Sequence, residues 1–118
     1  VITGSRPDPS AFGEFPHFIS FDGFIDVEYT PEQLERVALI SEPFCRYAKW
    51  KGGPKPLPAQ EKQVIEQLIA KSHKAGKPIR FWCSPDNAVA WETFRKLGID
   101  IINTDQPEAC TLYFQQNP

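Results

Sequence analysis

The chain has 118 residues, of which 41% are hydrophobic and 24% charged, so it is long enough to form one domain with a real hydrophobic core. The formal net charge of −2 argues against a nucleic-acid binder that is held by bulk electrostatics. No apolar run approaches the roughly 20 residues that a membrane-spanning helix needs.

The amino-terminal half predicts short strands separated by a helix. Residues 1–3 are a candidate strand, and residues 17–23 are rich in β-branched and aromatic side chains. A helix is predicted to begin at Thr30, which is a good N-cap residue and forms a capping-box pattern with Gln33. Residues 37–44 are a further apolar run of strand length.

The carboxyl-terminal half alternates helices and strands after a loop that is rich in glycine and proline. Such an alternation with short connections predicts an α/β fold with a parallel sheet and right-handed crossovers. The expected segments are a loop over 44–58, a helix from Pro58 that ends before Gly76, a strand over 77–84, a helix over 85–98, a strand over 99–103 and a helix over 107–116.

Polar side chains follow each predicted strand at the point where it ends. In parallel sheets and barrels the carboxyl ends of the strands carry the chemistry, so these side chains are predicted to converge on one rim and line a pocket. The competing interpretation is that Asp, Asn and Ser favour turns and helix caps, and it is preferred for Asp86 and Asn87. The candidate residues on the rim are Arg6, Asp22, Glu42, Trp82, Asn103 and Asp105.

The segment GKPIRFWCSPDNAVAWETFRKLGIDIINTDQPE (76–108) resembles the closing segment of the glycerophosphodiester phosphodiesterase and phosphatidylinositol phospholipase C-like superfamily. Trp82 matches the Trp at a strand end of that family, and residues 97–108 match its last strand and turn. Asn103 stands where many members have an apolar or small residue. Over residues 1–50 the resemblance is looser.

The resemblance implies a TIM-type (β/α)₈ barrel, a phosphodiester substrate and acid–base chemistry by two histidines. It also implies that a divalent cation, Ca²⁺ or Mg²⁺, takes part in the complete barrel. Because a complete barrel takes about 250 residues, the chain is expected to be the carboxyl-terminal part, the last four or five βα units. The absence of an initiator Met also suggests a piece of something longer. An extracytoplasmic location is a further implication.

Neither histidine of the chain is expected to replace the two that the resemblance implies. His17 precedes its predicted strand, and His73 lies inside a helix that packs outside the sheet, so neither is expected to reach the rim. The remaining candidates are expected to bind substrate, as pocket residues rather than as acid or base.

Arg6 is expected to pair with a phosphoryl oxygen, or else to be a solvated arginine. Asp22 is expected to accept hydrogen bonds from polyol hydroxyls. Trp82 is expected to form an apolar platform for the alcohol portion, or else to pack in the core. Glu42 and Asn103 complete the expected substrate-binding set. Asp105 is expected to brace the final turn or to orient a neighbouring binding group.

The cysteines and the basic loop carry weaker signals. Cys45, Cys83 and Cys110 form no CxxC pair, so buried or unreactive thiols are favoured over zinc ligands, and the redox compartment stays open. The aromatic and basic residues of 44–55 are compatible with a patch for anionic lipid headgroups or with a lid. A solvated loop with aromatic anchors is preferred.

Two functional hypotheses remain. The first is the substrate-binding half of a phosphodiester hydrolase, which acts on a small phosphodiester or lipid headgroup and needs its missing amino-terminal half. The second is a non-catalytic binding or structural module, which the two unpaired edges of a part-barrel would drive to form homo-oligomers.

Overall fold

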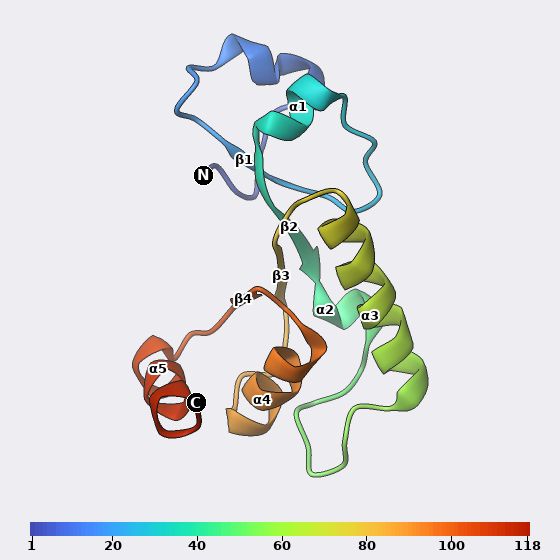
Figure 1. The fold of residues 1–118 in the computed structure, drawn as a ribbon, viewed down its shortest axis with the longest axis vertical. Helices are drawn as coiled ribbons and strands as arrows, with labels where there is room; N and C mark the ends of the chain where they lie inside the picture. The colour runs from blue at the N-terminus through green and yellow to red at the C-terminus, as the bar shows by residue number, and fades with distance from the viewer.

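The computed structural model describes residues 1–118 (Figure 1). The chain alternates short strands with helices, and α3 is the longest element. In chain order the elements are η1 (Pro9–Glu14), β1 (Phe21–Gly23), α1 (Pro31–Glu35), β2 (Val37–Pro43), α2 (Phe44–Tyr47), α3 (Ala59–Lys74), β3 (Ile79–Trp82), α4 (Ala88–Leu97), β4 (Ile101–Ile102) and α5 (Pro107–Gln116).

The four strands form one sheet in the order β1-β2-β3-β4, and every neighbouring pair is parallel. Ile2 adds an isolated parallel bridge to Phe21, at the outer edge of β1. The prediction of an α/β fold with a parallel sheet is confirmed. Because strands that are consecutive in the chain are also neighbours in the sheet, the arrangement is compatible with part of a barrel.

Several strands are shorter than the sequence pattern predicts. The first predicted strand is reduced to the bridge at Ile2, and β1 begins at Phe21 rather than at His17. The predicted loop over 44–58 begins with one helical turn, α2. Each difference lies at or next to the end of a strand, where tertiary contacts decide the backbone conformation.

The helix ends follow the local signals in the sequence. Thr30 accepts a hydrogen bond from the Gln33 N–H while the Gln33 side chain accepts one from the Thr30 N–H, which completes the predicted capping box. Asn87, rather than Asp86, caps α4 by accepting from the Ala90 N–H. Gly98 ends α4 in the left-handed conformation at φ 90°.

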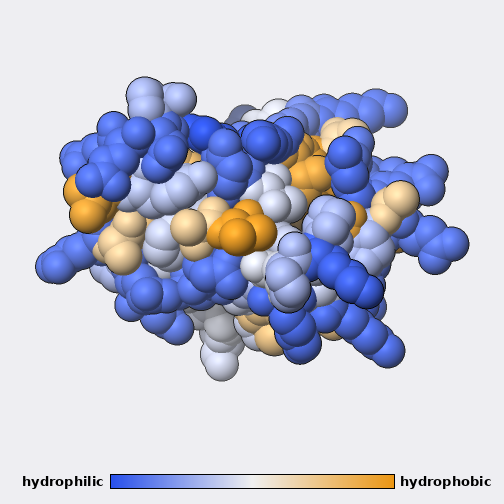
Figure 2. Space-filling view, turned by 90° about the horizontal axis from the view of Figure 1, so that it is seen from below, coloured by the Kyte–Doolittle hydropathy of each residue, from blue (hydrophilic) through white to orange (hydrophobic).

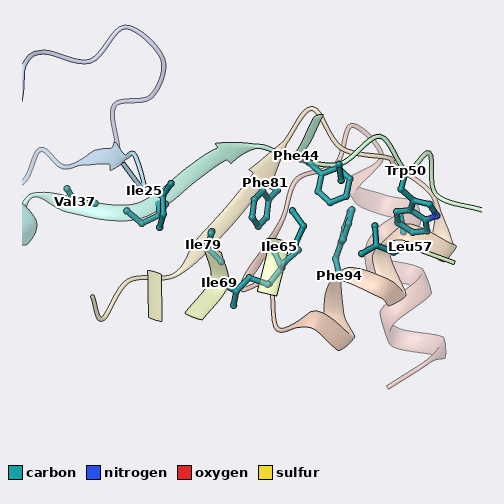
Figure 3. Close-up of a cluster of buried hydrophobic side chains, with 14 of the residues drawn as sticks. Ile25, Val37, Phe44, Trp50, Leu57, Ile65, Ile69, Ile79, Phe81 and Phe94 are labelled. Carbon is teal, nitrogen blue, oxygen red and sulfur yellow. The ribbon is translucent and has the colours of Figure 1, made fainter. Parts of the chain in front are cut away.

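The hydrophobic core lies between one face of the sheet and the helices. Side chains alternate along β3: Ile79 and Phe81 are buried, whereas Arg80 and Trp82 are not. Figure 3 shows the buried side chains in the layer between strands and helices, with contributions from α3 and α4. The labelled members are Ile25, Val37, Phe44, Trp50, Leu57, Ile65, Ile69, Ile79, Phe81 and Phe94.

The opposite face of the sheet, which we call the open face, carries different residues. Parallel strands place paired residues on the same face, and Ser41 pairs with Arg80, which in turn pairs with Ile101. Trp82 follows two residues further along β3 and is 47% exposed, and Ile101 is 37% exposed. Parallel sheets are normally covered on both faces, so exposed apolar side chains here mark an unpartnered surface.

Two cysteines form a disulfide, which corrects the expectation of unreactive thiols. Cys45 in α2 is bonded to Cys83, directly after β3, with 5.6 Å between their Cα atoms. The pairing is possible because β2 and β3 are adjacent and both cysteines follow their carboxyl ends. Cys110 is free and buried, as expected for an unreactive thiol.

Candidate functional site: a charged cluster on the open face

Four polar side chains gather on the open face from three strands and the segment after Ile2. Nη1 of Arg6 forms an ion pair with Oδ1 of Asp22. Nη2 of Arg80 lies 3.7 Å from Oδ2 of the same Asp22. Ser41 Oγ accepts hydrogen bonds from Nη2 of Arg80 at 2.9 Å and from Nε at 3.3 Å. We call Arg6, Asp22, Ser41 and Arg80 the arginine cluster.

The arginine cluster is largely removed from solvent. The side chain of Asp22 is 4% exposed and that of Arg6 is 10% exposed, whereas Arg80 keeps 26% of its side chain exposed. The guanidinium of Arg6 also stacks on the ring of Phe24, 3.5 Å from its centroid. Burial of this kind excludes the interpretation of Arg6 as a solvated arginine.

One buried donor of the arginine cluster has no partner. Nε of Arg6 is buried and makes no hydrogen bond in the chain. A buried N–H group without an acceptor costs roughly 1–3 kcal/mol. Arg6 is therefore fixed by Asp22 and Phe24, with one buried donor unsatisfied.

Trp82 lies on the open face next to the arginine cluster. It is two residues beyond Arg80 on β3, or about 6.6 Å along the strand. The other two tryptophans are buried at 8% exposure for Trp50 and 5% for Trp91. Trp82 is consequently the only tryptophan whose ring is free to meet a ligand, and core packing does not account for it.

Glu42 lies at the carboxyl end of β2 but on the other face of the sheet. It pairs with the buried Phe81 and is itself 1% exposed. Tyr47 Oη donates to Oε1 of Glu42 at 2.5 Å, and the Ile25 N–H donates to Oε2 at 3.4 Å. Burial and this hydrogen bond raise the pKa of Tyr47 to about 12. Glu42 and Asp22 therefore lie on opposite faces of the sheet and share no pocket.

Asp86 organises the polar stretch after β4. Its carboxylate accepts from Trp91 Nε1 and from the Asp105 N–H, each at 2.9 Å. Burial alone would raise the pKa of Asp86, but hydrogen bonds from Thr104, Asp105, Trp91 and Gln106 lower it overall. The turn is thus braced through the main chain of Asp105, whose own carboxylate is exposed. Asn103 is partly buried.

Both histidines lie away from the open face. His73 Nε2 is 2.7 Å from Asp100 Oδ2, which also accepts from the Ile79 N–H at the start of β3. The contact lies at the amino ends of β3 and β4. The helix α2 follows the carboxyl end of β2, at the opposite end of the strands. His17 is exposed in the turn before β1. Neither imidazole is within reach of Asp22 or Trp82.

The basic loop after β2 is anchored by its aromatic residues. Phe44 and Trp50 are buried, and Trp50 Nε1 donates to the Lys55 carbonyl at 2.7 Å. Figure 2 views the end of the molecule to which the arrow of β2 points, and that end is mostly hydrophilic with small, separate apolar groups. These features favour the solvated loop over a lipid-binding patch. A hollow of about 350 Å³ lies beside the disulfide, between Lys51 and Pro85.

The carboxylates of the chain do not fit a divalent cation by themselves. Asp22 is already paired with Arg6, and Glu42 faces the core on the other side of the sheet. No group of three or more His, Cys, Asp or Glu side chains is placed to hold a metal ion. The residues present therefore give no cation site.

Of the residues that the structure places on the open face, the sequence singles out Arg6, Asp22 and Trp82 as candidates but not Ser41 and Arg80. A signal for Arg80 was present, because it alternates with Ile79 and Phe81 and shares the phase of Trp82. Ser41 becomes recognisable only from the register that places it opposite Arg80. The candidates predicted from the sequence stand at strand ends, whereas Ser41 and Arg80 lie within β2 and β3.

Comparison with known proteins gives no match to a family model, a curated protein or a solved structure. None of the helices combines the length and the apolar character that crossing a membrane requires. The structure therefore shows an α/β protein with an all-parallel sheet and a charged, partly buried cluster on its open face.

Proposed function

We propose that the chain is the carboxyl-terminal part of a phosphoric diester hydrolase of the TIM-barrel type, acting on a glycerophosphodiester or phosphoinositide-like substrate. The chain supplies substrate-binding residues, and the general acid and base come from the amino-terminal half of the barrel. The observation that carries the proposal is the joint placement of Arg6, Arg80 and Trp82 on the one sheet face that no helix covers.

The topology supports a part-barrel. The bridge at Ile2 and the strands β1 to β4 follow one another in chain order and run parallel, with the helices on one face, as in an arc of a (β/α)₈ barrel. The radius of gyration is 15.3 Å, against about 13.5 Å for a compact domain of this length. We propose that further strands of the same barrel close around the open face.

The chemistry of the open face matches the two halves of a phosphodiester. Arg6 and Arg80 offer guanidinium donors, which favour phosphoryl oxygens because their fork geometry fits them. Trp82 offers an apolar surface about 6.6 Å further along the strand, within the span of a phosphodiester and its alcohol. Asp22 already contacts the two arginines. Its role in this proposal is therefore to position their guanidinium groups and not to bind polyol hydroxyls.

The disulfide supports an oxidising location for this chain. Cys45 and Cys83 are both exposed at the surface, where cytosolic reductants would keep the thiols reduced. An extracytoplasmic site of action is therefore part of the proposal. It agrees with a lipid headgroup or its glycerophosphodiester as substrate.

Calorimetric titration tests the function with glycerophosphocholine and glycerophosphoinositol as ligands, and with glycerol and inositol as reference ligands. We expect both diesters to bind, and the Trp82→Leu variant to bind them more weakly. Phe18→Leu is the matched control because Phe18 is 87% exposed and lies outside the strands. Diesters that bind no better than the free alcohols would contradict the proposal.

The alternative is a non-catalytic module that pairs with itself, and the exposed Ile101 and Trp82 on the open face favour it. Sedimentation analysis together with a phosphodiesterase assay over a range of Ca²⁺ and Mg²⁺ concentrations separates the two. A stable homodimer that neither binds nor hydrolyses the diesters would support the alternative.

A further inference from the structure

We propose that Arg6 and Arg80 together form a binding site for a single oxyanion, with Asp22 and Ser41 as positioning residues. The inference rests on the proposed function for the identity of that oxyanion as the phosphoryl group of the substrate. It adds Arg80 and Ser41 to the expected residues, and it assigns Asp22 a role other than contact with substrate hydroxyls.

The charge balance of the arginine cluster calls for an anion. Each of the two guanidinium groups carries one positive charge, and Asp22 supplies the one carboxylate that contacts them. Ser41 is a neutral acceptor for Arg80. One positive charge is therefore left without a counter-charge in a cluster that is largely shielded from water, where an incoming anion gains most.

The donors of the cluster call for acceptors as well. Nε of Arg6 is buried without a partner, although the side chain is nine-tenths buried and held in place by Asp22 and Phe24. The hydrogen bonds of Arg80 leave from Nε and Nη2, and Nη1 has no acceptor in the chain. An oxyanion is an acceptor that satisfies such donors without adding a hydroxyl or amide of its own.

The positions of the two guanidinium groups are fixed before any ligand arrives. Asp22 lies between them, since it pairs with Arg6 through Oδ1 and approaches Arg80 through Oδ2 at 3.7 Å. Ser41 holds Arg80 with two hydrogen bonds. Side chains that are already ordered lose less conformational entropy on binding, and this increases affinity.

A purely structural ion network is the competing account. It predicts that the arginines stabilise the sheet and that added anions do nothing specific. The oxyanion site predicts saturable binding that depends on both arginines and weakens with salt.

The test is calorimetric titration of the 118-residue chain with inorganic phosphate, and with acetate as a carboxylate probe. We expect saturable binding of phosphate, and a roughly tenfold or greater loss in the Arg80→Gln variant. Arg80→Lys keeps the positive charge but loses the forked donors of the guanidinium. We expect its phosphate affinity to fall between those of the unmodified chain and Arg80→Gln. Acetate that binds as tightly as phosphate would overturn the assignment to a phosphoryl group.

Arg46→Gln is the matched control, because Arg46 is exposed and pairs only loosely with Asp26 at 3.8 Å. It is expected to bind phosphate like the unmodified chain. Thermal unfolding in the presence and absence of phosphate provides a second measurement, in case a variant is less stable. Equal phosphate affinity in Arg80→Gln and Arg46→Gln would overturn the inference.

Failure of this inference differs from failure of the proposed function. If glycerophosphocholine binds to the chain and to Arg80→Gln alike, the oxyanion site is refuted while the function stands. If phosphate binds in an Arg80-dependent manner but neither diester does, the oxyanion site stands and the proposed function is refuted.

Discussion

The Asp86 carboxylate accepts a hydrogen bond from the main-chain N–H of Asp105 at 2.9 Å, and thereby ties the loop after β3 to the loop after β4. The same carboxylate accepts from the indole of Trp91 in α4. The side chain of Asp86 therefore connects its own loop to the loop after β4 and to α4. The polar stretch after β4 is accordingly a brace between loops.

Replacing Asp86 should therefore destabilise the fold. Asp86→Ala removes the acceptor of the Trp91 indole and of the Asp105 N–H, and we expect a loss of about 1–3 kcal/mol in the free energy of unfolding. Urea denaturation measures it. Asp105→Ala is the control, because only the main chain of Asp105 takes part, and equal losses in the two variants would contradict the brace.

The Cys45–Cys83 disulfide should contribute a large share of the stability. The cysteines are 38 residues apart in the chain, and a closed loop of that size corresponds to about 4 kcal/mol in the chain-entropy model. We expect a reductant to lower the melting temperature. The Cys45→Ser, Cys83→Ser double variant is the control: it should melt at the lower temperature with or without reductant, and a large further shift on reduction would contradict the assignment.

The contact between His73 and Asp100 should make stability depend on pH in acid. Burial would raise the pKa of Asp100, but hydrogen bonds from His73 and from the Ile79 N–H lower it below its usual value of 3.8. A lowered folded-state pKa contributes stability above the unfolded-state pKa that is lost as the pH falls through the folded-state value.

Urea denaturation between pH 7 and about pH 2 checks this dependence. We expect the difference in unfolding free energy between the unmodified chain and Asp100→Asn to shrink as the pH drops below 3.8. Asp105→Asn is the comparison because its carboxylate is exposed. A difference that stays constant over the acid range would show that ionised Asp100 contributes nothing.

The hydrogen bond from Tyr47 to Glu42 should be visible in alkaline titration. Because burial and Glu42 raise the pKa of Tyr47 to about 12, its contribution to stability is present below the ordinary pKa of 10 and is lost as the pH rises through the folded value. Ultraviolet absorbance of tyrosinate measures the titration. In Tyr47→Phe the late-titrating step should disappear, and its persistence would assign the step to another tyrosine.

The sequence by itself determined the features that depend on near neighbours in the chain. Local sequence specifies the capping box of Thr30 and Gln33 and the end of α4 at Gly98, because both depend on contacts between residues only a few positions apart. The parallel sheet follows from the alternation of strands and helices, because short crossovers allow little else. The origin of Asp22 and Trp82 from strands of one parallel sheet follows from the same alternation.

Only the tertiary structure decided which residues meet across the sheet. A shift of one residue moves a side chain to the opposite face, so only the register could place Glu42 against the core and Ser41 beside Arg80. The disulfide likewise required β2 and β3 to be neighbours before Cys45 and Cys83 could approach. Such long-range pairings depend on the packing of the whole sheet, and local patterns do not encode them.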